Sequence, residues 1–121
     1  MKIKFEVDEK SYLKFIPNNI KVQEILTIIG NLLENSIEEL KSRENGYIYI
    51  GIFQEEKIKI IVKNNGNKIA DDTKEEIFKR GFSTKGNFRG LGLYNIKNII
   101  ESLNGSLKLT SDKITTWEVE I

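Results

Sequence analysis

Two pairs of alternating apolar segments, each joined by a short polar turn, constrain this chain more than any other feature. The first pair is YIYIGIF (47–53) and KIKIIVK (57–63). The second pair is SLKLTS (106–111) and TTWEVEI (115–121). Alternation with a period of two is typical of half-buried strands, and a short connection makes neighbouring strands antiparallel. The chain is therefore expected to contain an antiparallel sheet with one covered face.

Segments with helical periodicity indicate what covers that sheet. A long helix is predicted from residue 22 to about 41, a short one over 71–80 and a third over 92–103, and KIKFEV (2–7) alternates as a further strand. The apolar stripe of the long helix is assigned to Val22, Leu26, Ile29, Leu33, Ile37 and Leu40. This order predicts an α+β fold, a two-layer sandwich whose mixed, mostly antiparallel sheet of about five strands carries about three helices on one face.

The size and composition of the chain fit one globular domain over residues 1–121. With 121 residues, 39% of them hydrophobic, it can bury one core and not two. A net charge of +1 provides no overall field that would attract nucleic acid or anionic membranes. No apolar run reaches the roughly 18 residues of a membrane span. We expect a soluble chain that binds no nucleic acid and is a monomer in isolation.

A glycine-rich basic segment precedes the last predicted helix. Gly86, Gly90 and Gly92 would let the backbone approach a ligand closely, and Lys85 and Arg89 add local positive charge. A helix N-terminus presents unpaired N–H groups and the positive end of the helix dipole, so this segment is a candidate phosphate site. A surface loop with ordinary caps is the alternative interpretation.

Two asparagines in the long helix form a second candidate site. Asn31 and Asn35 are four residues apart, so they lie on one side of the helix, roughly opposite the assigned apolar stripe. Asparagine prefers caps and turns to helix interiors, which makes the pair unusual. An amide oxygen can ligate Mg²⁺, whose coordination is completed by water and phosphates. A solvated polar face is the alternative.

The motifs together resemble a known family. NLLENSIEEL (31–40), VKNNGNKI (62–69) and IFKRGFSTKGNFRGLGL (77–93) are similar to the N box, the G1 box and the F and G2 boxes of the catalytic ATP-binding domain of sensor histidine kinases. That resemblance implies the Bergerat-type fold shared with gyrase, Hsp90 chaperones and MutL, a protein-histidine kinase activity, and the cofactors ATP and Mg²⁺. The motifs look most like those of citrate and dicarboxylate sensors, and peptide-pheromone sensor kinases are also similar.

The resemblance implies roles for individual residues. Asn35 matches the asparagine that ligates Mg²⁺, and Asn31 is the second catalytic candidate, beside the phosphates. In ATP-hydrolysing relatives the position of Asn31 holds a glutamate that activates water, and an amide cannot act as that base. Phe78 and Phe82 match the F box. The residues implied to bind nucleotide are Asn31, Asn35, Asn64, Gly66, Ile69, Ser83, Thr84, Lys85, Arg89, Gly90, Leu91, Gly92 and Leu93. Three of these, at positions 83–85, would belong to a lid over the nucleotide.

Several positions depart from the family pattern. The G1 aspartate that accepts a hydrogen bond from the adenine amino group is Asn64, which loses the charge assistance of that bond. The second G1 glycine is Lys68, and the usual basic residue after the magnesium asparagine is Glu38. The glycine of the last motif is missing, and Trp117 in the final strand is expected to be a packed core aromatic.

The composition also bears on the partners. The chain contains no histidine, so a phosphoacceptor histidine would lie on another domain. The resemblance implies a dimerisation and phosphoacceptor domain in the parent kinase, sensor domains that are absent from this chain, a response regulator downstream, and a cytoplasmic location beneath a membrane-bound sensor. Two alternatives stay open: a degenerate docking module of a phosphorelay, or an anti-sigma-type serine kinase of the same fold.

Overall fold

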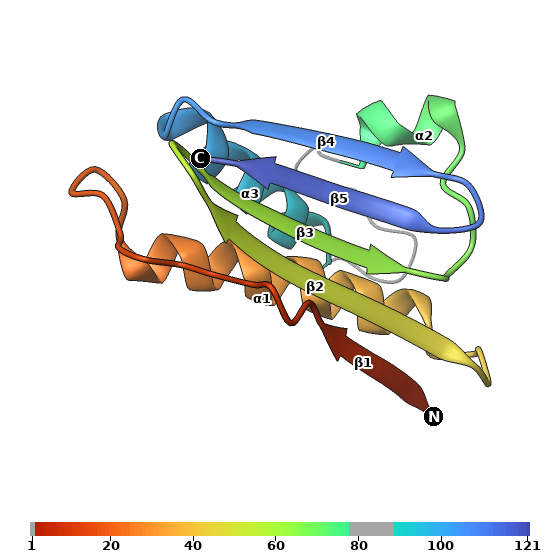
Figure 1. The fold of residues 1–121 in the computed structure, drawn as a ribbon. Coiled ribbons are helices and arrows are strands. Elements are labelled where there is room, and N and C mark those ends of the chain that lie inside the picture. Colours follow the sequence, from red (N-terminus) through yellow and green to blue (C-terminus); the bar gives the residue numbers. More distant parts are fainter. Residues whose placement is uncertain (1, 78–88) are drawn as a thin grey trace.

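The structure is a computed structural model that describes residues 2–77 and 89–121. Helices and strands follow one another along the chain as drawn in Figure 1. The elements are β1 (Ile3–Val7), α1 (Val22–Glu39), β2 (Gly46–Gln54), β3 (Ile58–Asn64), α2 (Asp71–Glu76), α3 (Arg89–Ser102), β4 (Ser106–Ser111) and β5 (Thr115–Glu120). These bounds lie close to the predicted strands and to the predicted long helix.

The strands form one five-stranded sheet in the order β1-β2-β3-β5-β4. Both predicted hairpins, β2–β3 and β4–β5, are present as antiparallel pairs, and β5 also pairs antiparallel with β3. The strand β1 pairs with β2 in parallel, which a chain can achieve only through a crossover, here the segment that contains α1. The sheet is therefore mixed and mostly antiparallel, as predicted.

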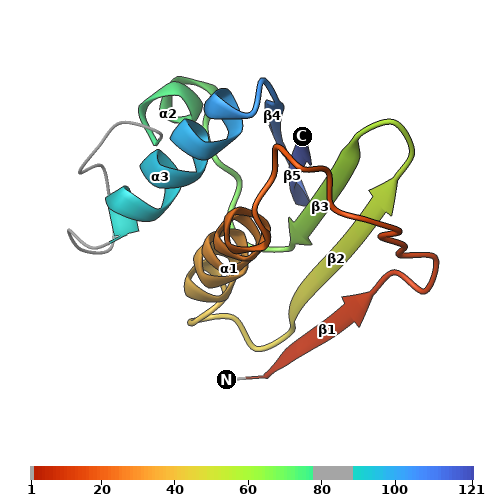
Figure 2. The same ribbon diagram turned by 90° about the vertical axis from the view of Figure 1, so that its left-hand side faces the viewer.

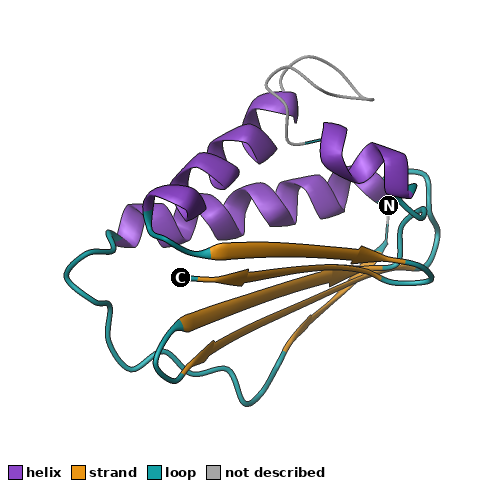
Figure 3. Ribbon diagram, turned by 90° about the horizontal axis from the view of Figure 1, so that it is seen from above, coloured by secondary structure: helices purple, strands orange, loops and turns teal. Residues whose placement is uncertain are grey.

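The helices occupy one side of the sheet, so the molecule has two layers (Figures 2 and 3). Buried isoleucine, leucine and valine side chains from α1, α3 and the inner face of the sheet form the core between the layers. Trp117 of β5 is fully buried in this core, which confirms its predicted packing role. The predicted α+β two-layer architecture is confirmed.

The apolar stripe assigned to α1 was wrong for the first turns of the helix, whereas Leu40 is fully buried and Ile29 and Leu33 pack against the core as assigned. Val22 and Leu26, both assigned to the stripe, are each 56% exposed. The buried residues of the helix are instead Ile25, Ile28, Leu32 and Ser36. Apolar residues cover more than one side of α1, so the helical period is clear while the buried face is set by packing against the sheet and α3. Asn31 and Asn35 consequently flank the buried face and are half-buried.

Two other helix boundaries differ from the predictions. The helix α3 begins at Arg89, three residues before the predicted start, so both glycines of the Arg89–Gly92 segment lie in its first turn. The regular part of α2 ends at Glu76, and residues 78–80 of the predicted helix lie outside the described residues. Within the described part of the chain, no helix combines the length and apolar character needed to cross a bilayer.

Candidate functional site

The side chain of Asn64 is the most deeply buried polar group predicted to bind a ligand. It ends β3, is 1% exposed, and accepts a hydrogen bond at Oδ1 from the Gly66 N–H at 2.8 Å. Its Nδ2 donates to Ser36 Oγ of α1 at 3.1 Å. Sequence analysis missed Ser36, although it continues the four-residue spacing of Ile28 and Leu32 and is therefore the one polar residue in that buried row. Both groups together fix the direction of the amide.

Gly66 lies where no side chain would fit. A Cβ added there would be 2.9 Å from Asn64 Oδ1 and 3.1 Å from Glu39 Cβ at the end of α1. The chain on its other side is held by Asn65, whose Oδ1 accepts from the Tyr47 N–H at 2.8 Å and whose Nδ2 donates to the Asn45 carbonyl at 2.9 Å. The backbone at Gly66 and the side-chain amides of Asn64 and Asn65 are therefore closely packed at this end of β3.

Asn31 contacts the start of α3. Its Nδ2 donates to the Thr27 carbonyl one turn earlier in α1, at 2.9 Å. This bond directs Oδ1 toward α3, where a Cβ on Gly92 would lie only 2.9 Å from it. The two predicted motifs that contain Asn31 and Gly92 therefore meet in the fold, and Gly92 has a packing role in addition to any role in binding.

Asn35 lies one turn further along the same side of α1. It is half-buried, and within the residues that the structure describes its side chain makes no hydrogen bond. Its neighbour Ser36 contacts Asn64, so this turn of α1 lies against the end of β3. A partly buried amide that makes no hydrogen bond to the described residues can ligate a hard cation through its oxygen.

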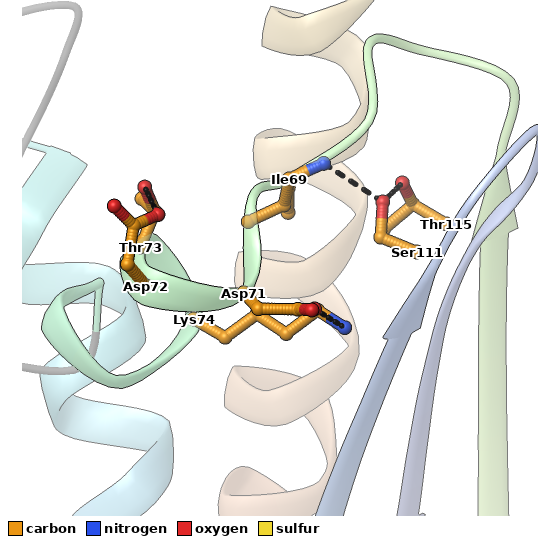
Figure 4. A network of polar contacts seen from close by, with 7 residues as sticks. All are labelled: Ile69, Asp71, Asp72, Thr73, Lys74, Ser111 and Thr115. Atoms are coloured by element: carbon orange, nitrogen blue, oxygen red, sulfur yellow. Dashed lines mark hydrogen bonds and ion pairs between the residues drawn. The ribbon is translucent and has the colours of Figure 1, made fainter.

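The segment that leads into α2 is held by hydroxyl groups of the β4–β5 hairpin (Figure 4). The Ile69 N–H donates to Ser111 Oγ at 2.9 Å, and Ser111 Oγ lies 2.7 Å from Thr115 Oγ1. Thr115 is buried and directly opposite Asn64 in the β3–β5 register. Sequence analysis did not identify Ser111 or Thr115 as site residues, because only strand pairing brings them beside Asn64.

The start of α2 carries a surface ion pair that is also drawn in Figure 4. Lys74 Nζ lies 3.1 Å from Asp71 Oδ1, and its hydrogen bond to that carboxylate lowers the pKa of Asp71. The Asp71 carboxylate is exposed and Lys74 is half-buried, so the pair contributes to the local conformation of α2 rather than to a buried site.

The remaining predicted ligands divide into two groups. Arg89, Gly90 and Leu91 form the beginning of α3, and Leu93 is 8% exposed and belongs to the hydrophobic core. Ser83, Thr84 and Lys85, with the F-box residues at 78 and 82, lie outside the described residues.

Two departures from the motif have structural explanations. Among the described residues, Asn104 is the only non-glycine residue with positive φ, so Lys68 occupies the second glycine position without a left-handed backbone. Glu38, at the position of the usual basic residue, forms an ion pair with Lys41 at 3.0 Å on the last turn of α1.

Residues 20–121 match the model of a protein family described as histidine kinase-, DNA gyrase B- and HSP90-like ATPase. The chain is 34% identical over 113 residues to the sensor protein CitS of Bacillus subtilis (strain 168). This alignment covers 93% of this chain and 21% of CitS. It is 36% identical over 93 residues to the sensor histidine kinase DcuS of Escherichia coli (strain K12), covering 76% of this chain and 17% of that protein. The chain thus spans about a fifth of the length of these relatives.

A solved structure of the catalytic domain of histidine kinase ThkA, in a nucleotide-free form, superimposes with a TM-score of 0.74 at 29% identity. The superposition covers 98% of this chain and 78% of that one. Sequence motifs and architecture therefore point to the same family.

Proposed function

Because the chain belongs to the histidine kinase-, DNA gyrase B- and HSP90-like ATPase family, we propose that it is the catalytic domain of a sensor histidine kinase and transfers the γ-phosphoryl group of ATP to a histidine on another domain. The observation that carries this proposal is the contact between Asn31 and Gly92. It brings the asparagine side of α1 against the first turn of α3, where the N–H groups of a helix favour an anion.

The residues around Asn64 fit a purine base. After accepting from the Gly66 N–H, Asn64 Oδ1 keeps a second lone pair, which suits the amino group of adenine. Asn64 Oδ1 and Glu39 Cβ fill the space beside Gly66, so glycine at this position lets the loop pack closely around the Asn64 amide. Ile69 is half-buried against the core and adds an apolar contact.

The two asparagines of α1 have different proposed roles. Asn35, whose side chain makes no hydrogen bond to the described residues, would ligate Mg²⁺ through its amide oxygen, whereas Asn31 donates to the Thr27 carbonyl and packs against Gly92. An amide at position 31 cannot activate water, so the site favours transfer over hydrolysis. ATP and Mg²⁺ would supply the phosphoryl group and neutralise its charge. The protein contributes positioning, with the first turn of α3 and the predicted residues at 83–85 as further phosphate ligands.

The phosphoacceptor is proposed to be a histidine on the dimerisation domain of the parent kinase, since this chain has none. A response regulator would receive the phosphoryl group next. As a part of a longer sensor kinase, the domain would act on the cytoplasmic side of the membrane, where ATP is available.

The test is a titration with a non-hydrolysable ATP analogue, with Mg²⁺ and with a chelator. We expect weak binding that is stronger with Mg²⁺. Asn35→Ala should remove the dependence on Mg²⁺, whereas Asn98→Ala, which changes an exposed asparagine of α3, should keep it. Equal affinity in the chelator would exclude Asn35 as a metal ligand. Complete absence of binding would favour the docking-module alternative.

A further inference from the structure

The strand β1 is an open edge of the sheet. It lies at one end of the strand order, and among the described residues its one partner strand is β2 (Figure 2). The Asp8 N–H that follows the strand donates to the Ile50 carbonyl of β2 at 2.8 Å. Because consecutive residues of a strand direct their N–H and C=O groups to opposite edges, Lys4 and Glu6 also bond toward β2. The backbone groups of Ile3, Phe5 and Val7 therefore face the free edge.

The same three residues give this edge an apolar face. In the parallel register Ile3, Phe5 and Val7 lie opposite Gly46, Ile48 and Ile50 and share the helix side of the sheet with them. No helix covers the outer part of this surface, since Phe5 is 54% and Val7 66% exposed. An edge strand with free backbone groups and exposed apolar side chains is a template for pairing with another strand.

The charges of the strand make it complementary to itself. When two copies are aligned antiparallel about Phe5, Lys4 lies opposite Glu6, Lys2 opposite Asp8 and Ile3 opposite Val7. The outward-facing backbone groups of residues 3, 5 and 7 become hydrogen-bonded pairs in this register. Opposite charges and apolar pairs directly across antiparallel strands are both stabilising.

In place of the monomer expected from the sequence, we propose that β1 pairs with β1 of a second copy of this chain, with the two-fold axis at Phe5, so that the two sheets become one continuous sheet. Such a contact is isologous and closes on itself as a dimer. The other end strand, β4 (Ser106–Ser111), lacks this property, because Lys108 is its one charged residue and no antiparallel self-pairing of the strand gives it an acidic partner.

The existing contacts of the acidic groups are compatible with this pairing. The Tyr47 hydroxyl donates to Glu6 Oε1 at 2.7 Å, and the Tyr49 hydroxyl donates to Asp8. A carboxylate has about four acceptor positions, so Glu6 and Asp8 can each also accept from a lysine of the second copy. Asn31 and Gly92 of the candidate site meet between α1 and α3, whereas β1 lies at the end of the strand order beside β2.

The test is sedimentation velocity over a range of concentrations, with complementary charge reversals. Wild-type chain should dimerise reversibly. Glu6→Lys and Lys4→Glu should each weaken the dimer at least about tenfold, because each places like charges across the strands. An equimolar mixture of the two variants should restore a heterodimer, since every charged pair is then attractive. The double variant K4E/E6K should dimerise as the wild type does, and Lys108→Glu on β4 should have no effect.

Restoration in the mixture also establishes that both variants are folded, even though Glu6→Lys loses the Tyr47 hydrogen bond. Wild-type chain that stays monomeric at about 1 mM, the weak end of specific affinities, would overturn the proposal. Dimers that persist in both single variants would mean that the interface lies elsewhere, and this result would also overturn the proposal. Open-ended oligomers would contradict the two-fold axis.

Discussion

The amide of Asn64 is fixed in one orientation by two neighbours that differ in chemistry. The Gly66 N–H can only donate, so it requires the oxygen of the amide, and the nitrogen is left to Ser36 Oγ. A flipped amide would place its NH₂ group against the Gly66 N–H. The side chain therefore presents an acceptor where the family resemblance places an aspartate, and a carboxylate would accept the same bonds because a serine hydroxyl can also donate.

We predict that Asn64→Asp strengthens binding of an ATP analogue about three- to tenfold, because charge-assisted hydrogen bonds are roughly twice as strong as neutral ones. Calorimetric titration of the two proteins measures the change. Asn67→Asp is the matched control, since it adds the same charge at an exposed position in the same loop. Unchanged or lower affinity for Asn64→Asp would mean that Asn64 does not occupy the adenine position.

The sequence indicated Asn64 but not what holds it. Its place after an alternating strand and before Gly66 was sufficient to identify the motif. Ser36 and Thr115 reach it only through the packing of α1 on the sheet and the β3–β5 register. Neither long-range relationship has a signature in local sequence, so this part of the candidate site could not be predicted.

Tyr49 provides a titratable probe of the β1–β2 contact. Partial burial and then the hydrogen bond to Asp8 raise its pKa from 10.0 to about 12. A raised folded-state pKa stabilises the fold below the unfolded value of 10.0, and this contribution is lost as pH rises through about 12. We predict that Tyr49→Phe reduces the loss of stability over this alkaline range, measured by urea unfolding at each pH. Tyr12→Phe, which changes an exposed tyrosine, should leave that loss unaltered.

At the scale of elements, α1 illustrates the difference between period and phase. Its apolar residues recur helically, but Val22 and Leu26 are exposed while Ile25 and Ile28 are buried. Both sets fit a helical stripe, and only contact with β3 and α3 selects one of them. The existence and length of the helix were therefore predictable, whereas its buried face was not.

The end of α3 is a Schellman motif whose geometry is set by two consecutive residues. The Asn104 N–H donates to the Glu101 carbonyl and the Gly105 N–H to the Ile100 carbonyl, with Asn104 at φ 56°. Gly105 also packs against β5, where an added Cβ would collide with the Glu120 carbonyl oxygen. The turn therefore determines how α3 connects to the sheet.

We predict that Gly105→Ala lowers the free energy of unfolding by about 1–3 kcal/mol, because the strand backbone cannot move away easily. Asn104→Gly should leave stability unchanged or raise it by at most about 1 kcal/mol, since glycine adopts the left-handed conformation without penalty. Urea unfolding of both variants distinguishes the two effects. If Gly105→Ala left the free energy of unfolding unchanged, β5 would have to be able to shift relative to α3.

At the scale of the molecule, the candidate site joins elements that are distant in the chain. Asn31 and Ser36 come from α1, Asn64 from β3 and Gly92 from α3, and these elements also build the single core. The order of the motifs and the hairpins allowed the two-layer fold to be predicted. The parallel partner of β1 and the position of β5 between β3 and β4 could not be, because non-local pairing follows from the packed whole.

We predict that ATP with Mg²⁺ raises the unfolding temperature of the whole domain in one step. Ligand at about 100 times its dissociation constant adds about 2.7 kcal/mol to the free energy of unfolding, which corresponds to roughly 5–15 °C for a domain of this size. Trp117 is the single tryptophan and is buried in β5, so its fluorescence reports the sheet, while far-ultraviolet circular dichroism reports mainly α1 and α3. Because the site spans both layers, the two signals should give coincident transitions that shift by the same amount. A shift in the helical signal alone would mean that the layers unfold separately, and no shift in either would argue against nucleotide binding by this chain.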